Sequence, residues 1–176
     1  MRARTGDIET MSDFQIERLE GRHDRKNFDC GEDSLNVYLQ RYARQNVEND
    51  SARVYVATQN EANRICGYFT LCAGQVDALA FADRIRKGWP RDVPTVLVGR
   101  LAVDLDFQGR GLGGDLMFGV LNIVVSVSER IGIAAIDVWA LNSRARAFYE
   151  KLGFASLQDD LFHLYLATAT ARKSLS

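Results

Sequence analysis

The pattern of apolar and polar positions divides the first half of the chain into a strand, a helix and a hairpin. Alternating apolar residues predict a short strand at 14–19. Apolar side chains then recur at helical spacing and predict an amphipathic helix over about 32–47. Its apolar face is formed by Leu35, Tyr38, Leu39, Tyr42 and Ala43. Two β-rich runs, 53–58 and 65–73, flank a polar stretch and predict an antiparallel hairpin.

The second half of the chain alternates helical and strand patterns. The predicted elements are a weaker helix over 78–87, a long apolar strand over 95–104, a strong helix with Leu112, Leu116, Val120, Val124 and Val127 on one face, a strand over 133–139, a short helix over 142–152 and a strand over 161–167. Gly153 follows the short helix, where a left-handed glycine typically ends a helix. The order β-α-β-β-α-β-α-β-α-β predicts an α/β fold with a sheet of mixed direction.

Length and composition limit the classes of protein to consider. The chain has 176 residues, of which 47% are apolar, so one domain with a real core is expected over 13–170. We expect a flexible extension at 1–12 and a C-terminal tail at 171–176. The formal net charge of -1 argues against a nucleic-acid coat protein but leaves room for a local basic patch. No apolar run reaches the roughly 20 residues of a membrane span, and the first residues lack a secretory core. A soluble, cytoplasmic protein without membrane contact is therefore expected.

The supply of histidine and cysteine restricts the chemistry further. Two histidines, His23 and His163, leave little material for a metal site or a Ser-His-Asp triad, so no metal is expected. Three cysteines without a CxxC spacing predict reduced thiols rather than a disulfide framework. Cys30 is interpreted as a small buried residue and not as a nucleophile. Catalysis would then depend on backbone donors, tyrosines, carboxylates or a borrowed cofactor.

The stretch between the strand at 95–104 and the strong helix is rich in glycine. It reads Gln108-Gly109-Arg110-Gly111-Leu112-Gly113-Gly114. Glycines allow tight turns and close approach of a ligand to the backbone, and the first N–H groups of the helix lack intrahelical partners. A diphosphate fits such a set of donors, and Arg110 adds a charge-assisted hydrogen bond. The alternative is a glycine-rich turn that binds nothing.

Two better-known phosphate loops do not match. A Walker loop requires Lys and then Ser or Thr after the last glycine, whereas Gly114 is followed by Asp115. The dinucleotide fingerprint requires GxGxxG in an opening βαβ unit, whereas GxGxGG occurs here after a predicted hairpin.

Two segments carry motifs with specific spacing: Arg100-Leu-Ala-Val-Asp104 followed by Gln108-Gly-Arg-Gly-Leu-Gly113, and the segment from Asn142 to Phe154. The first is similar to the Gln/Arg-x-x-Gly-x-Gly/Ala signature of the GNAT-fold N-acetyltransferases, and the second is similar to the closing motif of that fold. The resemblance extends over 13–167. It implies an α/β fold with a mixed, mostly antiparallel sheet that has a central splay and helices on its sides.

The same resemblance implies acetyl-CoA as co-substrate and assigns residues to it. The thioester arm would lie along Leu101, Ala102 and Val103, and a backbone N–H near Leu101 would polarise the thioester carbonyl. The diphosphate would lie at Gln108, Gly109, Arg110, Gly111, Leu112, Gly113 and Gly114. Asn142 and Arg146 would contact the pantetheine and nucleotide ends. Tyr149 would give its proton to the departing thiolate, the alternative being a packed phenol bonded to a neighbour.

Four segments carry a narrower resemblance: Phe28-Asp-Cys-Gly31, Leu35-Asn-Val-Tyr-Leu39, the LVGRLAVD stretch that contains Arg100, and AFYEKLGF. This resemblance is to the acetyltransferase toxins of bacterial toxin–antitoxin pairs. It implies acetylation of the α-amine of aminoacyl-tRNA, which blocks translation, and a ribbon-helix-helix antitoxin as partner. The alternatives are a housekeeping acetyltransferase for a small amine or a protein N-terminus, and a non-catalytic acyl-CoA-binding module. The sequence does not decide whether the protein forms a homodimer.

A basic segment is the candidate contact for tRNA. Between 84 and 92 the chain has four basic residues and one acidic residue, a local net charge of +3. Arg84, Arg86, Lys87, Trp89 and Arg91 suit contact with phosphates and stacking on a base, and Arg100 would extend the patch. A solvated loop with an ordinary buried tryptophan is the equal alternative. Asp104 and Glu150 are interpreted as solvated carboxylates, and no general base is named.

Overall fold

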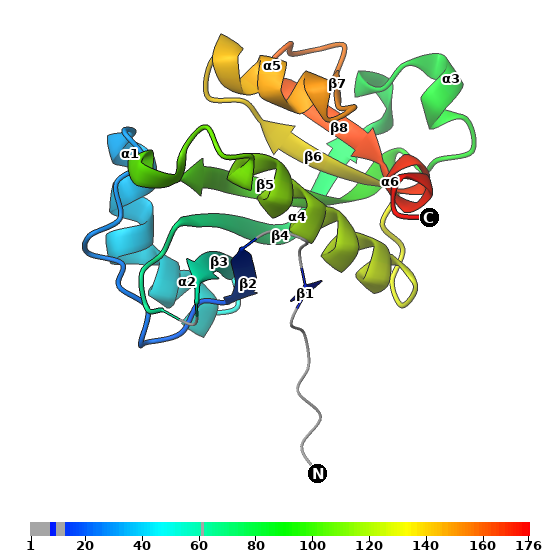
Figure 1. The fold of residues 1–176 in the computed structure, drawn as a ribbon. Coiled ribbons are helices and arrows are strands. Elements are labelled where there is room, and N and C mark those ends of the chain that lie inside the picture. Colours follow the sequence, from blue (N-terminus) through cyan, green and yellow to red (C-terminus); the bar gives the residue numbers. More distant parts are fainter. Residues whose placement is uncertain (1–7, 10–12, 61) are drawn as a thin grey trace. The chain divides into compact units, whose positions relative to one another are not determined.

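Within the described part of the chain, eight strands form one sheet that is accompanied by helices (Figure 1). The chain divides into two compact units. The computed structural model describes residues 8–9, 13–60 and 62–176. Unit 1 contains the described residues up to Leu71 together with Arg100–Val120, and unit 2 contains Cys72–Gly99 and Leu121–Ser176. Most of the expected N-terminal extension lies outside the described residues.

Across the sheet, neighbouring strands lie in the order β1-β2-β3-β4-β5-β6-β8-β7. Their bounds are β1 Ile8–Glu9, β2 Phe14–Arg18, β3 Arg53–Gln59, β4 Gly67–Asp77, β5 Asp92–Val103, β6 Ala135–Trp139, β7 Ala155–Ser156 and β8 His163–Ala167. The pairs β1–β2, β2–β3, β3–β4, β6–β8 and β7–β8 are antiparallel, whereas β5–β6 is parallel. The prediction of a mixed, mostly antiparallel sheet is confirmed.

Unit 1 packs an irregular helix on the strands of the predicted hairpin. The helix consists of α1 Asp33–Val37, the π-helical turn η1 Tyr38–Tyr42 and α2 Ala43–Glu48. Leu39 and Ala43 are fully buried against the core that contains Val56 and Tyr68. The apolar spacing predicts a single α-helix here; the wider π turn adds a residue and leaves Tyr42 half exposed while Tyr38 stays buried.

Unit 2 begins with a segment whose pattern predicts one helix over 78–87. The structure has a 3₁₀ turn, η2 Ala78–Ala80, and a short helix, α3 Asp83–Arg86. Phe81 separates them in an extended conformation, which directs its fully buried ring at Tyr165, 4.8 Å away between ring centroids. Burial of one aromatic ring thus overrides a weak helical pattern.

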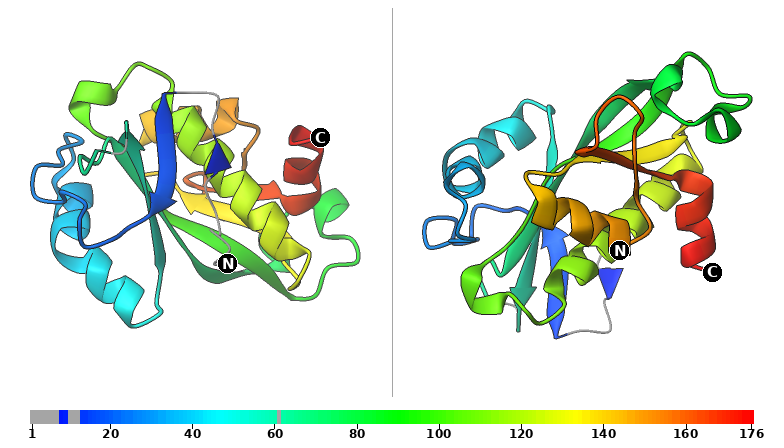
Figure 2. Two further views of the ribbon diagram at one scale, coloured as in Figure 1. Left: turned by 60° about the horizontal axis from the view of Figure 1, so that its bottom comes forward. Right: turned by 90° about the horizontal axis from the view of Figure 1, so that it is seen from above.

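The remaining elements of the chain are helices α4 Leu112–Ser128, α5 Ser143–Lys151 and α6 Thr168–Ser174, with a 3₁₀ turn, η3 Leu105–Phe107. Gly153 follows α5 with φ +94°, as predicted for a left-handed helix end. Helix α6 (red in Figure 2) continues to Ser174, so it includes most of the stretch 171–176 that was expected to be a tail. The side chain of Ala171 in this helix is fully buried.

Strands β4 and β5 run side by side (Figure 2), and Gly74 of β4 lies against β5. A Cβ atom at Gly74 would lie 2.7 Å from Oγ1 of Thr95, a residue that is itself buried. We therefore expect Gly74→Ala to lower the free energy of unfolding by about 1–3 kcal/mol. Urea denaturation measures this as a lower midpoint at constant m.

Gly132→Ala is the matched control for Gly74→Ala, because a Cβ there would meet no atom within 4 Å. Its free energy of unfolding should stay within about 0.5 kcal/mol of the wild type. Equal stability of Gly74→Ala and the wild type would contradict the expected crowding at Thr95.

Candidate active site

The glycine-rich segment forms the turn between η3 and α4 in unit 1. Gly109 and Gly111 have φ values of +77° and +82°, which L-residues adopt only with strain. A Cβ at either position would meet no atom within 4 Å, so backbone conformation and not crowding requires glycine. The space beside the turn is open, as a site for a large anion requires.

Backbone donors meet at the start of α4. The N–H groups of the first helical turn have no intrahelical partners, and Asp115 N is the first to bond back, to Gly111 O at 3.2 Å. The guanidinium of Arg110 is exposed and lies 5.4 Å from the ring centroid of Phe107. Leu112, Gly113 and Gly114 thus present donors at the positive end of a 17-residue helix, beside an exposed cation. These residues fit a diphosphate.

The strand before this turn continues beyond its parallel neighbour. The β5–β6 ladder pairs Thr95–Val98 with Ala135–Val138, and β5 then continues to Val103. Within this extension Ala102 is buried, while Leu101 and Val103 are partly exposed. Backbone groups at 101–103 that β6 does not pair are suited to the pseudo-strand hydrogen bonds expected of a thioester arm.

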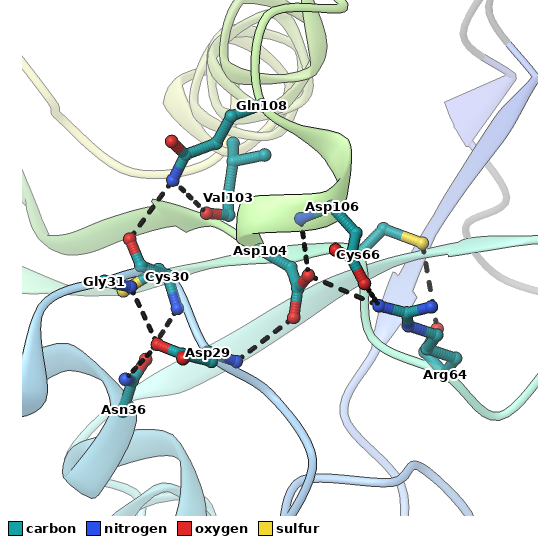
Figure 3. A network of polar contacts seen from close by, with 10 residues as sticks. All are labelled: Asp29, Cys30, Gly31, Asn36, Arg64, Cys66, Val103, Asp104, Asp106 and Gln108. Carbon is teal, nitrogen blue, oxygen red and sulfur yellow. Dashed lines mark hydrogen bonds and ion pairs between the residues drawn. The ribbon is translucent and has the colours of Figure 1, made fainter.

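The side chain of Gln108 is engaged within the protein (Figure 3). Its Nε2 atom donates to Val103 O at 2.9 Å and to Cys30 O at 3.1 Å. The carboxamide nitrogen therefore holds the start of the turn, and a direct bond from this atom to a diphosphate would compete with two existing bonds.

Asn142, Arg146 and Tyr149 belong to α5 and its N-cap in unit 2. Asn142 caps the helix, because its Oδ1 atom accepts a hydrogen bond from Ala145 N at 2.9 Å. Arg146 Nε lies 3.0 Å from Glu150 Oε1 one helical turn later. Arg146 and Tyr149 are three residues apart within α5, so they lie on one side of the helix, and Asn142 stands at its N-terminal end.

Tyr149 is buried, with 5% of its surface exposed. Its ring contacts Phe148 and Phe154, at centroid distances of 5.2 and 5.8 Å. Burial raises the pKa of Tyr149 to about 12, since the phenolate would lose its hydration. The phenol therefore keeps its proton across the physiological range and is available as a hydrogen-bond donor.

The basic segment at 84–91 borders a hollow of about 650 Å³ in unit 2. Arg86, Lys87, Trp89 and Arg91 line it together with Asp77, Ala78, Leu79 and Asp83. Arg86 pairs with Asp83, and Arg91 Nε lies 3.8 Å from Asp77 Oδ2. Trp89 is partly buried and packs edge-on against Phe81, 5.1 Å away between ring centroids. The packing of Trp89 agrees with the second interpretation, an ordinary packed tryptophan, while the contact of the basic residues with tRNA stays a prediction.

Arg100 lies in unit 1, apart in the sequence from the basic segment. Its guanidinium carbon is 3.6 Å from the ring centroid of Tyr38, a close cation–π contact. Tyr38 in turn stacks on Tyr68, whose hydroxyl donates to Leu35 O at 2.7 Å. Arg100 is therefore held in a fixed position rather than free in solvent.

Asp104 corrects one expectation, because it is buried and not a solvated carboxylate. It is 3% exposed, and it accepts hydrogen bonds from Asp29 N at 3.1 Å and Asp106 N at 3.0 Å. Arg64 Nη2 lies 3.4 Å from its Oδ1. Glu150, by contrast, is exposed, as expected.

A buried acid–histidine pair was not predicted from the sequence. His163 Nε2 lies 2.7 Å from Asp137 Oδ2, and the ring of His163 stacks on Trp139 at 4.0 Å. Asp137 Oδ1 is buried without a hydrogen-bond partner among the described residues. An acidic residue inside the apolar run 133–139 was the available signal, because a buried carboxylate requires a partner.

Thiols and metal ligands contribute little to the site. Burial raises the pKa of the Cys30 thiol, whose Sγ atom lies 3.7 Å from Glu32 O. Within the part of the chain that the structure describes, no three His, Cys, Asp or Glu side chains gather into a group that could hold a metal ion. In the same ranges, every helix is too short or too polar to cross a bilayer.

Comparison with known proteins gives consistent matches. The family of the acetyltransferase (GNAT) domain matches residues 50–156. The tRNA-acetylating toxin of Mycobacterium tuberculosis is 36% identical over 155 residues, which cover 88% of this chain and 92% of that protein.

Two solved structures of the toxin AtaT are also similar. AtaT complexed with acetyl-methionyl-tRNAfMet has a TM-score of 0.86 and 32% identity, covering 93% of this chain and 100% of that chain. A tyrosine-to-phenylalanine mutant of AtaT, bound to the C-terminus of the antitoxin AtaR and to acetyl-CoA, has a TM-score of 0.80 and 30% identity. That match covers 94% of this chain and 99% of that chain.

Proposed function

The chain belongs to the GNAT family of acetyltransferases, and we propose that it transfers the acetyl group of acetyl-CoA to the α-amine of an aminoacyl-tRNA. The observation that carries this proposal is the similarity along nearly the whole chain to a tRNA-acetylating toxin. The similarity to AtaT with acetyl-methionyl-tRNAfMet supports the same class of acceptor. Acetylated aminoacyl-tRNA has no free amine for peptide-bond formation, so the protein would act as a toxin that blocks translation.

The residues of unit 1 are suited to binding acetyl-CoA, the acetyl donor. Acetyl-CoA supplies an activated acetyl thioester when bound, and an AtaT mutant binds it. The donors at Gly109–Gly114 would hold its diphosphate, with Arg110 adding charge. A backbone N–H near Leu101 would stabilise the negative charge that develops on the thioester oxygen.

Tyr149 is the proposed proton donor. The attacking amine must be neutral, and the amine of an aminoacyl ester is less basic than that of lysine, so no general base is assigned. Tyr149, which keeps its proton because burial raises its pKa, would donate its hydroxyl hydrogen to the departing sulfur. Asn142 and Arg146, on the same helix, would contact the pantetheine and nucleotide ends of the donor.

Mass spectrometry of charged tRNA tests the proposed reaction directly. Purified protein with acetyl-CoA should add one acetyl group to the amine of aminoacyl-tRNA and stop cell-free translation. Acetylation of a small amine while translation continues would favour the housekeeping alternative. Binding of acetyl-CoA without thiol release over a panel of amines would favour the non-catalytic module.

The cationic rim of the hollow in unit 2 is the proposed contact for tRNA phosphates. Arg84 and Lys87 are exposed, and Arg86, Trp89 and Arg91 line the hollow with Lys87. The double variant Arg84→Ala/Lys87→Ala should raise KM for tRNA and lessen its salt dependence by roughly 0.7–0.9 in log–log slope per lost contact. Arg130→Ala/Lys173→Ala removes two exposed charges elsewhere in unit 2 and should leave both unchanged. Equal behaviour of the two double variants would exclude this contact.

An antitoxin is the proposed partner. AtaT binds the C-terminus of the antitoxin AtaR, which supports a protein inhibitor of the same kind here. We expect a neighbouring reading frame for a short ribbon-helix-helix protein and co-purification of the two products. Because charged tRNA is the proposed substrate, the cytoplasm is the proposed compartment.

A further inference from the structure

A turn from the N-terminal part of the chain is hydrogen-bonded to the base of the glycine-rich turn (Figure 3). This connecting turn is Phe28-Asp29-Cys30-Gly31, which precedes α1. Asp29 O accepts a bond from Leu105 N at 2.8 Å, and Asp29 N donates to Asp104 Oδ2 at 3.1 Å. Cys30 O accepts from Gln108 Nε2 at 3.1 Å. These bonds thus join two segments that lie far apart in the sequence.

The connecting turn is itself rigidly organised. Asp29 Oδ1 accepts bonds from Gly31 N and from Asn36 Nδ2, both at 2.8 Å, and these two donors lower the pKa of Asp29. Asn36, which is buried, accepts a bond from Cys30 N at 2.9 Å. Gly31 has φ +85°, and its Cα faces Leu105, whose Cδ2 would lie 3.3 Å from a Cβ there. The turn therefore has one defined shape in which it meets η3.

Asp104 and Gln108 receive this support at the two ends of η3. Asp104 caps η3 through Asp106 N, and its buried carboxylate is also bonded to Asp29 N and Arg64. Gln108 bridges Cys30 O to Val103 O, the last residue of β5. The residue before Gly109 is thus fixed to both the strand and the connecting turn.

We infer that Asp29 and Gln108 are positioning residues for the donor's diphosphate, which they hold indirectly by fixing the glycine-rich turn. The inference rests on the proposed binding of acetyl-CoA at that turn. Gly109 and Gly111 give the turn large conformational freedom, and ordering it at the moment of binding would cost affinity. Bonds from a preformed turn remove part of that cost in advance. Neither side chain needs to contact the donor for this effect.

The test compares two acetyl donors, acetyl-CoA and acetyl-pantetheine, which share the thioester, whereas only acetyl-CoA has the diphosphate. Asp29→Ala should raise KM for acetyl-CoA by about tenfold, whereas KM for acetyl-pantetheine, which lacks the diphosphate, should change by less than about twofold. Asp29→Asn keeps the Oδ1 acceptor for Gly31 N and Asn36 and should behave as the wild type. General damage to the fold would affect both donors equally, and that result would overturn the inference.

Binding calorimetry separates this inference from the proposed function. Gln108→Met removes the two amide bonds at an exposed position and should weaken binding of acetyl-CoA by about tenfold, with an unchanged melting temperature in the absence of the coenzyme. Failure of the wild type to bind acetyl-CoA would overturn the proposed function. Normal binding by the wild type and by both Asp29→Ala and Gln108→Met would overturn the positioning role alone.

Discussion

Replacement of Tyr149 by phenylalanine should lower kcat for acetyl transfer by about 10²–10⁴-fold and leave the affinity for acetyl-CoA within about twofold. The variant removes one hydroxyl group and keeps the ring that packs on Phe148 and Phe154. Only the donor to the departing sulfur is lost, so binding should be almost unchanged. Single-turnover kinetics and calorimetry measure the two quantities separately.

The pH dependence of kcat gives the same prediction a second readout. The protonated phenol is the active form, and burial raises its pKa to about 12. Titration of Tyr149 should therefore cause no fall in kcat between about pH 8.5 and 10.5. An ordinary tyrosine, by contrast, is half deprotonated at about pH 10. A fall with a midpoint near that ordinary value would contradict the buried phenol as proton donor.

Tyr165→Phe is the matched control for Tyr149→Phe. Tyr165 is also a buried tyrosine of unit 2, with its ring against Phe81, and burial also raises its pKa. Its variant should keep kcat near that of the wild type. Equal losses in the two variants would mean that the effect comes from packing and not from proton donation.

Replacement of Gly111 by alanine should weaken acetyl-CoA binding by at least about tenfold. At φ +82° an L-residue costs roughly 1–2 kcal/mol, and the turn can relieve this only by changing the directions of its N–H groups. Those groups are the proposed donors to the diphosphate. Calorimetric titration with acetyl-CoA measures the loss.

Gly88→Ala separates backbone strain from loss of the site. Gly88 has φ +85° and, as at Gly111, a Cβ added there would meet no atom within 4 Å, so the strain should be similar. Both variants should lose comparable stability, and only Gly111→Ala should lose affinity for acetyl-CoA. Wild-type affinity in Gly111→Ala would exclude the glycine-rich turn as the diphosphate site.

Elements with a strong local pattern could be predicted from the sequence. Helix α4 has apolar residues at regular helical spacing, the strands β3 and β5 are β-rich runs, and Gly153 ends α5 as expected. The helix predicted over 78–87 was wrong in extent, because the burial of Phe81 interrupts it. The π turn at Tyr38–Tyr42 was not predictable either, since the apolar residues of this segment have the sequence spacing of an ordinary α-helix.

The residues of the candidate site also fall into two groups, those that could be predicted from the sequence and those that could not. The glycine-rich turn and Tyr149 could be named from motifs of adjacent residues. The pairing of Asp137 with His163 depends on the register between β6 and β8, which no local pattern contains. The same holds for Asp104, which has the pattern of a solvated strand end and is buried by a turn 75 residues away in the sequence.

The sequence by itself determined most of the longer helices and strands, the family and the glycine-rich turn, because these depend on residues within a few positions of one another; the short strands β1 and β7 and helix α6 were not predicted. Only the tertiary structure decided the burial of Asp104, the engagement of Gln108 and the high pKa of Tyr149. Hydrogen-bond partners and loss of hydration come from segments that are distant along the chain, and folding alone brings them together.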